Sequence, residues 1–209
     1  DLRAAAAEGR NIMPASIIAA KAGVTTGEWA AALRDIFGEY RAPTGVGETI
    51  SNSAIGLDGL RAEIAAFAST AQRRLTLVIG KPGLDGHSNG AEQIAVRARD
   101  CGMRVIYEGI RMTPEAIVQA VENARADVLG LSILSGSHVP LVRETLARMA
   151  KAGLGHVPVV VGGIIPPDDA AALCAEGVAR VYTPKDFDLN VIMGDLVKLA
   201  GKGAELAAE

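Results

Sequence analysis

The clearest candidate for chemistry in this sequence is His87, which shares a short polar segment with Asp85 and Lys81. A carboxylate that accepts a hydrogen bond from one imidazole nitrogen fixes the tautomer and leaves the other nitrogen free as a metal ligand or base. A nearby lysine would modulate the charge of that carboxylate. Taken alone, the pattern fits a structural or capping histidine equally well. The sequence has no set of Cys, His or acidic residues with zinc-site spacing, so a single histidine better suits the axial position of a metal held by a macrocycle.

These residues lie in a loop between a predicted strand and a predicted helix. Residues 75–80 form an apolar run typical of a buried strand, and residues 89–101 have helical periodicity with a buried stripe of Ala91, Ile94, Ala95 and Ala98. Asn89 and Glu92 are predicted to form the N-cap pair of this helix. Gly90 would then occupy its first position, where a ligand could approach closely.

The rest of the chain repeats this alternation. Further strands are predicted at 103–107, 127–134, 157–161 and 180–182. One helix is predicted to start at residues 113–115, with Thr113 as its cap, and others at 139–152, 167–176 and 189–199. Continuous apolar strands separated by amphipathic helices indicate a parallel sheet covered on both faces. The fold class is therefore α/β: a doubly wound, five-stranded parallel sheet of flavodoxin-like or Rossmann-like type with strand order 2-1-3-4-5.

Polar and glycine-rich segments follow four of these strands. They comprise residues 81–90, 132–138, Gly162–Gly163 and 182–184. Ligands of doubly wound sheets bind beyond the carboxyl ends of the strands where strand order reverses, which here lies between the first and third strands. Glycines at 83, 86, 90, 136, 162 and 163 either serve turns or leave room for a large flat ligand.

Composition narrows the possible partners and surroundings. The net charge of the 209 residues is −3 and there is no basic run, so neither nucleic acid nor a membrane surface is an expected partner. Cys101 and Cys174 lack metal-site spacing and are expected to be buried in a reducing cytoplasm. No signal peptide or membrane-spanning segment is predicted.

The N-terminal quarter has a different organisation. Helices are predicted at 2–8, 11–23 and 25–37, with a hydroxyl cap at Thr25 and an acid at Glu28, and with Trp29 and Phe37 in their core. We predict a helical tail of a preceding domain at 1–40, an interdomain linker with a helix (57–71) at 41–73, the α/β domain at 74–203 and a tail at 204–209. The chain starts with Asp1 and is expected to be a fragment of a longer polypeptide.

The segment from Asp85 to Gly90 matches the DxHxxG motif of cobalamin-binding domains. Ser132-Ile133-Leu134 matches their SxL segment and Gly162-Gly163 their paired glycines, in the same order. The resemblance, which covers residues 75–199, implies adenosylcobalamin bound with its own base detached from cobalt and with His87 as the lower axial ligand. It implies that Asp85 and Lys81 tune His87, that Ser132 hydrogen-bonds the displaced base, and that no residue here is catalytic. The cofactor-binding residues it implies are Asp85, Gly86, His87, Ser88, Gly90, Ser132, Leu134, Ser135, Gly136, Gly162, Gly163, Tyr182, Thr183 and Pro184.

Residues 11–46 resemble the end of the substrate barrel and the linker of acyl-CoA mutases, most closely those that act on ethylmalonyl-CoA, then those that act on methylmalonyl-CoA. The segments LSGSH and YTPKD favour the same subfamily. This implies a radical carbon-skeleton rearrangement, from ethylmalonyl-CoA to methylsuccinyl-CoA or from methylmalonyl-CoA to succinyl-CoA. It also implies an acyl-CoA site in a barrel domain, a homodimeric enzyme and a G-protein chaperone for cofactor loading. The 209-residue chain alone is expected to be inactive.

Three alternatives stay open at this point. A corrinoid methyl carrier of a methyltransferase shares the three motifs, although such modules usually have a helical bundle before the sheet. A cobalamin-dependent sensor would need an output region, and residues 200–209 are short for one. A receiver-like or flavin-binding domain would have no cobalamin, but a receiver needs an aspartate where Ser132 stands. His138 could contact the corrin edge or cap its helix.

Overall fold

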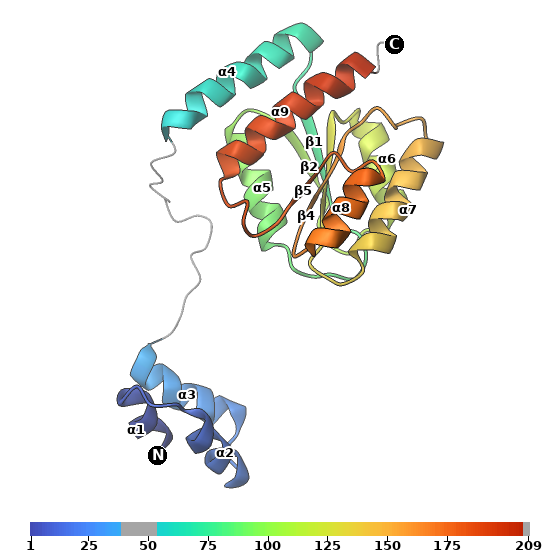
Figure 1. The fold of residues 1–209 in the computed structure, drawn as a ribbon. Coiled ribbons are helices and arrows are strands. Elements are labelled where there is room, and N and C mark those ends of the chain that lie inside the picture. The colour runs from blue at the N-terminus through green and yellow to red at the C-terminus, as the bar shows by residue number, and fades with distance from the viewer. Residues whose placement is uncertain (39–53, 207–209) are drawn as a thin grey trace. The chain divides into compact units, whose positions relative to one another are not determined.

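The computed structural model describes residues 1–38 and 54–206, which belong to two compact units, Asp1–Thr49 and Ile50–Glu209 (Figure 1). The predicted linker residues 41–53 lie outside the described residues. Within the described ranges, no helix is long and apolar enough to cross a membrane.

The first unit contains helices α1 (Leu2–Ala7), α2 (Met13–Lys21) and α3 (Thr26–Phe37). The predicted cap of α3 is confirmed: the Thr25 side chain accepts a hydrogen bond from the Glu28 N–H, and the Glu28 side chain accepts one from the Thr25 N–H. Phe37 is 65% exposed, so its predicted core position is wrong. Phe37 is the last residue of α3, so no further turn of this helix follows to cover its side chain.

The second unit is built around a five-stranded, all-parallel sheet. Its strands are β1 (Thr76–Gly80), β2 (Arg104–Tyr107), β3 (Val128–Ser132), β4 (Val159–Gly162) and β5 (Arg180–Tyr182), in the order β2-β1-β3-β4-β5. Its helices are α4 (Ala54–Ala71), α5 (Asn89–Asp100), α6 (Pro114–Ala124), α7 (His138–Lys151), α8 (Pro167–Ala175) and α9 (Leu189–Leu206). The predicted fold class and strand order are confirmed.

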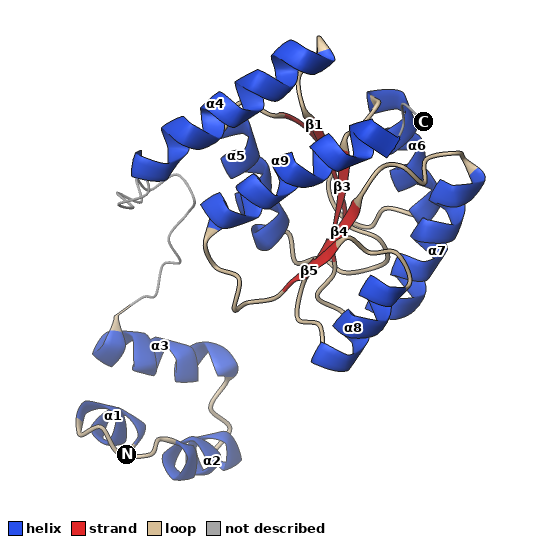
Figure 2. Cartoon of the chain, turned by 45° about the horizontal axis from the view of Figure 1, so that its top comes forward, coloured by secondary structure: helices blue, strands red, loops and turns tan. Residues whose placement is uncertain are grey.

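Helices cover both faces of the sheet, and the strands lie between the two layers (Figure 2). Strand side chains alternate between the layers: Leu77 and Ile79 pack with α4, α5 and α9, whereas Val78 packs with α6, α7 and α8. Burial on both faces explains why the strands are apolar throughout rather than alternating with polar residues.

The register of the strands brings their carboxyl ends together. Gly80 of β1 is opposite Leu131 of β3, and Gly162 of β4 is opposite both Ser132 and Tyr182. The loops that follow β1, β3, β4 and β5 therefore start at one edge of the sheet. This is the edge at which ligands of such folds bind.

Three local predictions are wrong. The N-cap of α5 is Ser88 rather than Asn89, and no side chain caps this helix, because Ser88 already has helical φ and ψ of −92° and −23°. Helix α9 extends past 199 to Leu206, since Gly203 allows close contact with the His156 carbonyl and Pro158: an added Cβ would lie 2.9 Å from each. Cys174 is exposed, because α8 buries only Leu173.

Candidate functional site

The loop after β1 is held in a fixed position by the neighbouring strand's loop. The Gly83 N–H donates to the Met112 carbonyl at 3.0 Å, and the Met112 N–H donates to the Lys81 carbonyl at 2.9 Å. Gly83 has φ of +81°, and a Cβ there would lie 2.8 Å from a Leu141 methyl. A glycine is therefore required at this turn, which directs the following residues, Asp85 to Ser88, along the edge of the sheet.

Asp85 is the anchor of the loop. Its side chain is 2% exposed and accepts hydrogen bonds from the His87 N–H at 3.0 Å and the Leu134 N–H at 2.8 Å. Burial alone would raise the pKa of this carboxyl. The two backbone hydrogen bonds, the His87 ring and the Lys81 charge outweigh burial and hold the pKa well below its ordinary value, so Asp85 is a carboxylate at neutral pH.

The His87 ring is fixed on one side and open on the other. Its Nδ1 lies 2.7 Å from Asp85 Oδ1, while 79% of the side chain is exposed. Because Asp85 is ionised and can only accept, Nδ1 carries the proton, and the lone pair of the neutral ring is on Nε2. The arrangement suits a metal ligand whose second nitrogen is oriented by a carboxylate.

Lys81 connects this pair to the end of β3. Its side chain is fully buried, and Nζ lies 3.4 Å from Asp85 Oδ2, 3.1 Å from the Ser132 carbonyl oxygen and 3.3 Å from Ser132 Oγ. An ammonium group has three protons, and these three acceptors can use all of them. The Ser132 hydroxyl accepts from Lys81, so its own proton remains available to a ligand.

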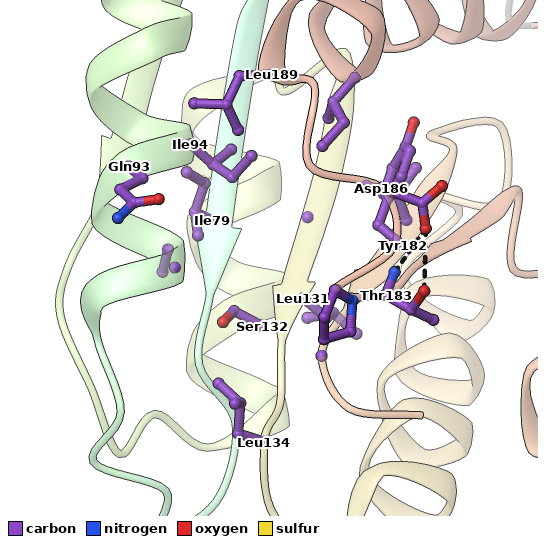
Figure 3. Close-up of a pocket in the computed structure, with 18 of the residues that line it drawn as sticks. Ile79, Gln93, Ile94, Leu131, Ser132, Leu134, Tyr182, Thr183, Asp186 and Leu189 are labelled. Carbon is purple, nitrogen blue, oxygen red and sulfur yellow. Dashed lines mark hydrogen bonds between the residues drawn. The ribbon is translucent and has the colours of Figure 1, made fainter. Parts of the chain in front are cut away.

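A cavity of about 420 Å³ opens beside Ser132, between α5 and the loops after β3, β4 and β5 (Figure 3). We call it the slot. Its volume falls in the usual range of small-molecule sites, and its walls are mostly apolar. It is lined by Leu77, Ile79, Gly90, Ala91, Gln93, Ile94, Gly130, Leu131, Ser132, Leu134, Val160, Gly162, Gly163, Ile164, Tyr182, Thr183, Pro184, Asp186, Phe187, Leu189, Ile192 and Leu196.

Two glycines on the walls have different reasons for being glycine. A Cβ on Gly163 would lie 1.9 Å from the Ile133 carbonyl oxygen, so the backbone packing of the β3 and β4 loops excludes any side chain there. A Cβ on Gly90 would meet no atom within 4 Å. Protein packing therefore does not explain Gly90, but a molecule occupying the slot would.

Eight of the predicted cofactor residues line the slot, namely Gly90, Ser132, Leu134, Gly162, Gly163, Tyr182, Thr183 and Pro184. Asp85 and His87 stand beside it in the β1 loop. Gly86, Ser88, Ser135 and Gly136 do not line it. Ser135 Oγ instead lies 2.7 Å from Ser137 Oγ.

His138 is buried, and its Nε2 lies 2.9 Å from Asp169 Oδ2 of α8. It ties α7 to α8 and does not line the slot. Its Nδ1 also lies 3.4 Å from the carbonyl oxygen of Ser135, just before α7, so the helix-capping hypothesis fits this histidine better than contact with a corrin edge.

Helices α5 and α9 contribute wall residues that lie outside the three motifs. Gln93 and Ile94 come from α5, and Leu189, Ile192 and Leu196 from α9. Their spacing is that of any buried helix face, so the sequence offers no signal that separates a wall of the slot from the core.

Tyr182 is held from the far side of the slot. Its hydroxyl donates to Asp195 Oδ2 at 3.4 Å, and Asp195 also pairs with Arg180 at 2.8 Å. Burial, followed by the negative charge of Asp195, raises the pKa of Tyr182 above its usual range. The Tyr182 side chain that lines the slot is therefore uncharged.

Over residues 1–38 and 54–206, no group of three or more His, Cys, Asp or Glu side chains is placed to hold a metal ion.

Several known proteins are similar to this chain. Residues 75–186 match the family model described as the B12 binding domain. The whole chain is 63% identical to an ethylmalonyl-CoA mutase of Cereibacter sphaeroides over 32% of that protein. It is 42% identical over 112 residues to the pivalyl-CoA mutase small subunit of Xanthobacter autotrophicus, covering 54% of this chain and 75% of that one.

Among solved structures, a cobalamin-binding protein from Desulfitobacterium hafniense has the same fold, with a TM-score of 0.53 at 17% identity, over 95% of this chain and 98% of that one. The chain spans about a third of the length of the ethylmalonyl-CoA mutases it matches. The family match covers more than half of the 209 residues, including the β1 loop and most of the slot. The chain therefore belongs to the B12-binding domain family.

Proposed function

We propose that the second unit binds cobalamin with the nucleotide tail in the slot and with His87 as the lower axial ligand of cobalt. One observation carries the proposal. A largely exposed imidazole is hydrogen-bonded through Nδ1 to a buried carboxylate, and that carboxylate also accepts from the N–H of Leu134, which lines the apolar slot.

The residues present fit this cofactor. The slot is apolar enough for an aromatic base, and Ser132 has a hydroxyl proton available for a nitrogen of that base. The backbone at Gly90 leaves space that no protein atom fills. The exposed side of the His87 imidazole is accessible to a metal ion that is held by a macrocycle.

Cobalamin in its adenosyl form supplies a weak cobalt–carbon bond as a source of radicals. The residues of this chain bind and orient rather than react. Asp85 orients the His87 ring through Nδ1, which leaves Nε2 as the atom that would bind the metal, and Lys81 keeps Asp85 and Ser132 in place. None of them needs to act as a general acid or base.

We infer further that the chain is the cofactor-binding part of an acyl-CoA mutase that rearranges ethylmalonyl-CoA to methylsuccinyl-CoA. The 63% identity to an ethylmalonyl-CoA mutase across all 209 residues supports this, against 31% identity to a methylmalonyl-CoA mutase of the same organism. The same relatives favour a mutase over a methyl carrier.

The residues that contact acyl-CoA would come from polypeptide outside this sequence. A homodimer, a G-protein chaperone and a cytoplasmic location stay predictions.

Cobalamin titration tests the proposal. Wild type should bind cobalamin and give the absorption spectrum of histidine-ligated, base-off cofactor. His87→Ala should lose that spectrum, whereas His156→Ala, which changes a histidine before the amino-terminal end of β4, should keep it. Identical spectra for wild type and His87→Ala would refute the axial role of His87.

A further inference from the structure

Phe187 occupies an unusual position for a large aromatic side chain. It belongs to the loop between β5 and α9 and lines the slot, yet it is 85% exposed. Single exposed apolar side chains are common on protein surfaces, but Phe187 is both exposed and part of the lining of an apolar slot. Phe187 therefore stands at the mouth of the slot rather than in its wall.

The residues on either side fix the backbone at this point. The Asp186 side chain accepts hydrogen bonds from the Thr183 N–H at 2.8 Å and the Thr183 hydroxyl at 3.2 Å (Figure 3). The Asp188 side chain accepts one from the Asn190 N–H at 2.9 Å, at the start of α9. Phe187 is held between two such turns, so its exposure does not come from a loosely tethered loop.

The chemistry of the slot indicates what would cover the ring. Apolar side chains of α5 and α9, among them Ile94 and Ile192, line the slot and favour an uncharged, flat, apolar group. Asp186 is the charged residue among those lining the slot, and its carboxylate already accepts the two hydrogen bonds from Thr183. An aromatic base would be covered on its inner side by these walls and would leave its outer side to Phe187.

We propose that Phe187 closes over the aromatic base of the nucleotide tail and determines the preference of the site for cobamides that have such a base. The proposal rests on the function proposed above and adds a residue outside the three motifs. Phe187 contacts the nucleotide tail and sets specificity for it, and it does not contact cobalt.

The test compares three probes: cobalamin, cobinamide, which lacks the nucleotide tail, and α-ribazole, the nucleoside of the tail alone. Burial of one phenyl ring corresponds to about a tenfold to hundredfold change in affinity. Phe187→Ala should weaken binding of cobalamin and α-ribazole by that factor and leave the affinity for cobinamide unchanged. The affinity of Phe187→Leu for cobalamin should lie between those of wild type and Phe187→Ala. Phe37→Ala, which removes an exposed phenyl ring from the first unit, is the matched control and should match wild type.

Each outcome decides between the claims. If Phe187→Ala binds cobalamin as tightly as wild type, or loses cobinamide affinity by the same factor as cobalamin affinity, the inference is wrong and the proposed function survives. If wild type binds no cobalamin, the proposed function itself fails. An unchanged urea midpoint for Phe187→Ala, expected for so exposed a side chain, shows that the fold is intact.

Discussion

Gly90→Ala should change stability and cofactor affinity in opposite directions. Gly90 lies in the first turn of α5, its φ is not in the left-handed region, and a Cβ there would meet no protein atom within 4 Å. Nothing in the protein alone therefore opposes an alanine. The glycine is unfavourable for the helix, and the slot is the feature that accounts for it.

The two magnitudes follow from general values. Replacing glycine by alanine in a helix stabilises it by about 0.5–1 kcal/mol, and the value near an N-terminus is at the lower end. An extra methyl group in a filled, close-packed site costs about 1–3 kcal/mol. The affinity for cobalamin should then fall by about fivefold to 150-fold.

Gly59→Ala is a matched control. Gly59 lies within α4, a Cβ there would also meet no atom within 4 Å, and Gly59 does not line the slot. Urea denaturation without cofactor should show both variants to be more stable than wild type. Cobalamin titration should show weaker binding for Gly90→Ala alone. Equal affinity of the two variants would refute the reasoning that the slot receives the cofactor beside Gly90.

Two further predictions concern groups that the structure leaves in special environments. The lowered pKa of Asp85 means that its ionised form stabilises the fold above its ordinary pKa of 3.8, and that this contribution is lost as the pH falls toward the folded-state pKa. The excess stability of wild type over Asp85→Asn should therefore be present at pH 7 and shrink below about pH 4 in denaturation series; a difference that does not depend on pH would contradict it. The Tyr107 hydroxyl is buried without a partner among the described residues, so Tyr107→Phe should raise the free energy of unfolding by about 1 kcal/mol in urea denaturation. A loss of stability would show that the hydroxyl has a favourable partner.

The fold was predictable because its determinants are local. Apolar strand runs, the Thr113 cap and the Thr25 cap each involve residues that are near one another in sequence. The strand order came from a general rule for doubly wound sheets. The length of α9 depends instead on distant segments, since Gly203 packs against the backbone of His156.

In the site, too, contacts between residues close in sequence were predictable and contacts between distant residues were not. Asp85 and His87 are two residues apart, so their hydrogen bond could be anticipated from sequence. The link from Lys81 to Ser132 spans 51 positions and appears only in the fold. Ile94 was predicted as part of a buried helix stripe, and the structure shows it on the wall of the slot. Hydrophobic periodicity cannot separate a side chain that faces the core from one that faces a ligand.

The central claim is that a nitrogen of His87 binds cobalt, and electron paramagnetic resonance of bound cob(II)alamin tests it most directly. Protein labelled with nitrogen-15 histidine should change the nitrogen splitting of the cobalt lines from triplets to doublets. His87→Ala should abolish the isotope effect, and His156→Ala should retain it. Triplets that persist in the labelled wild-type protein would show that the nitrogen on cobalt comes from another source, and would contradict the account.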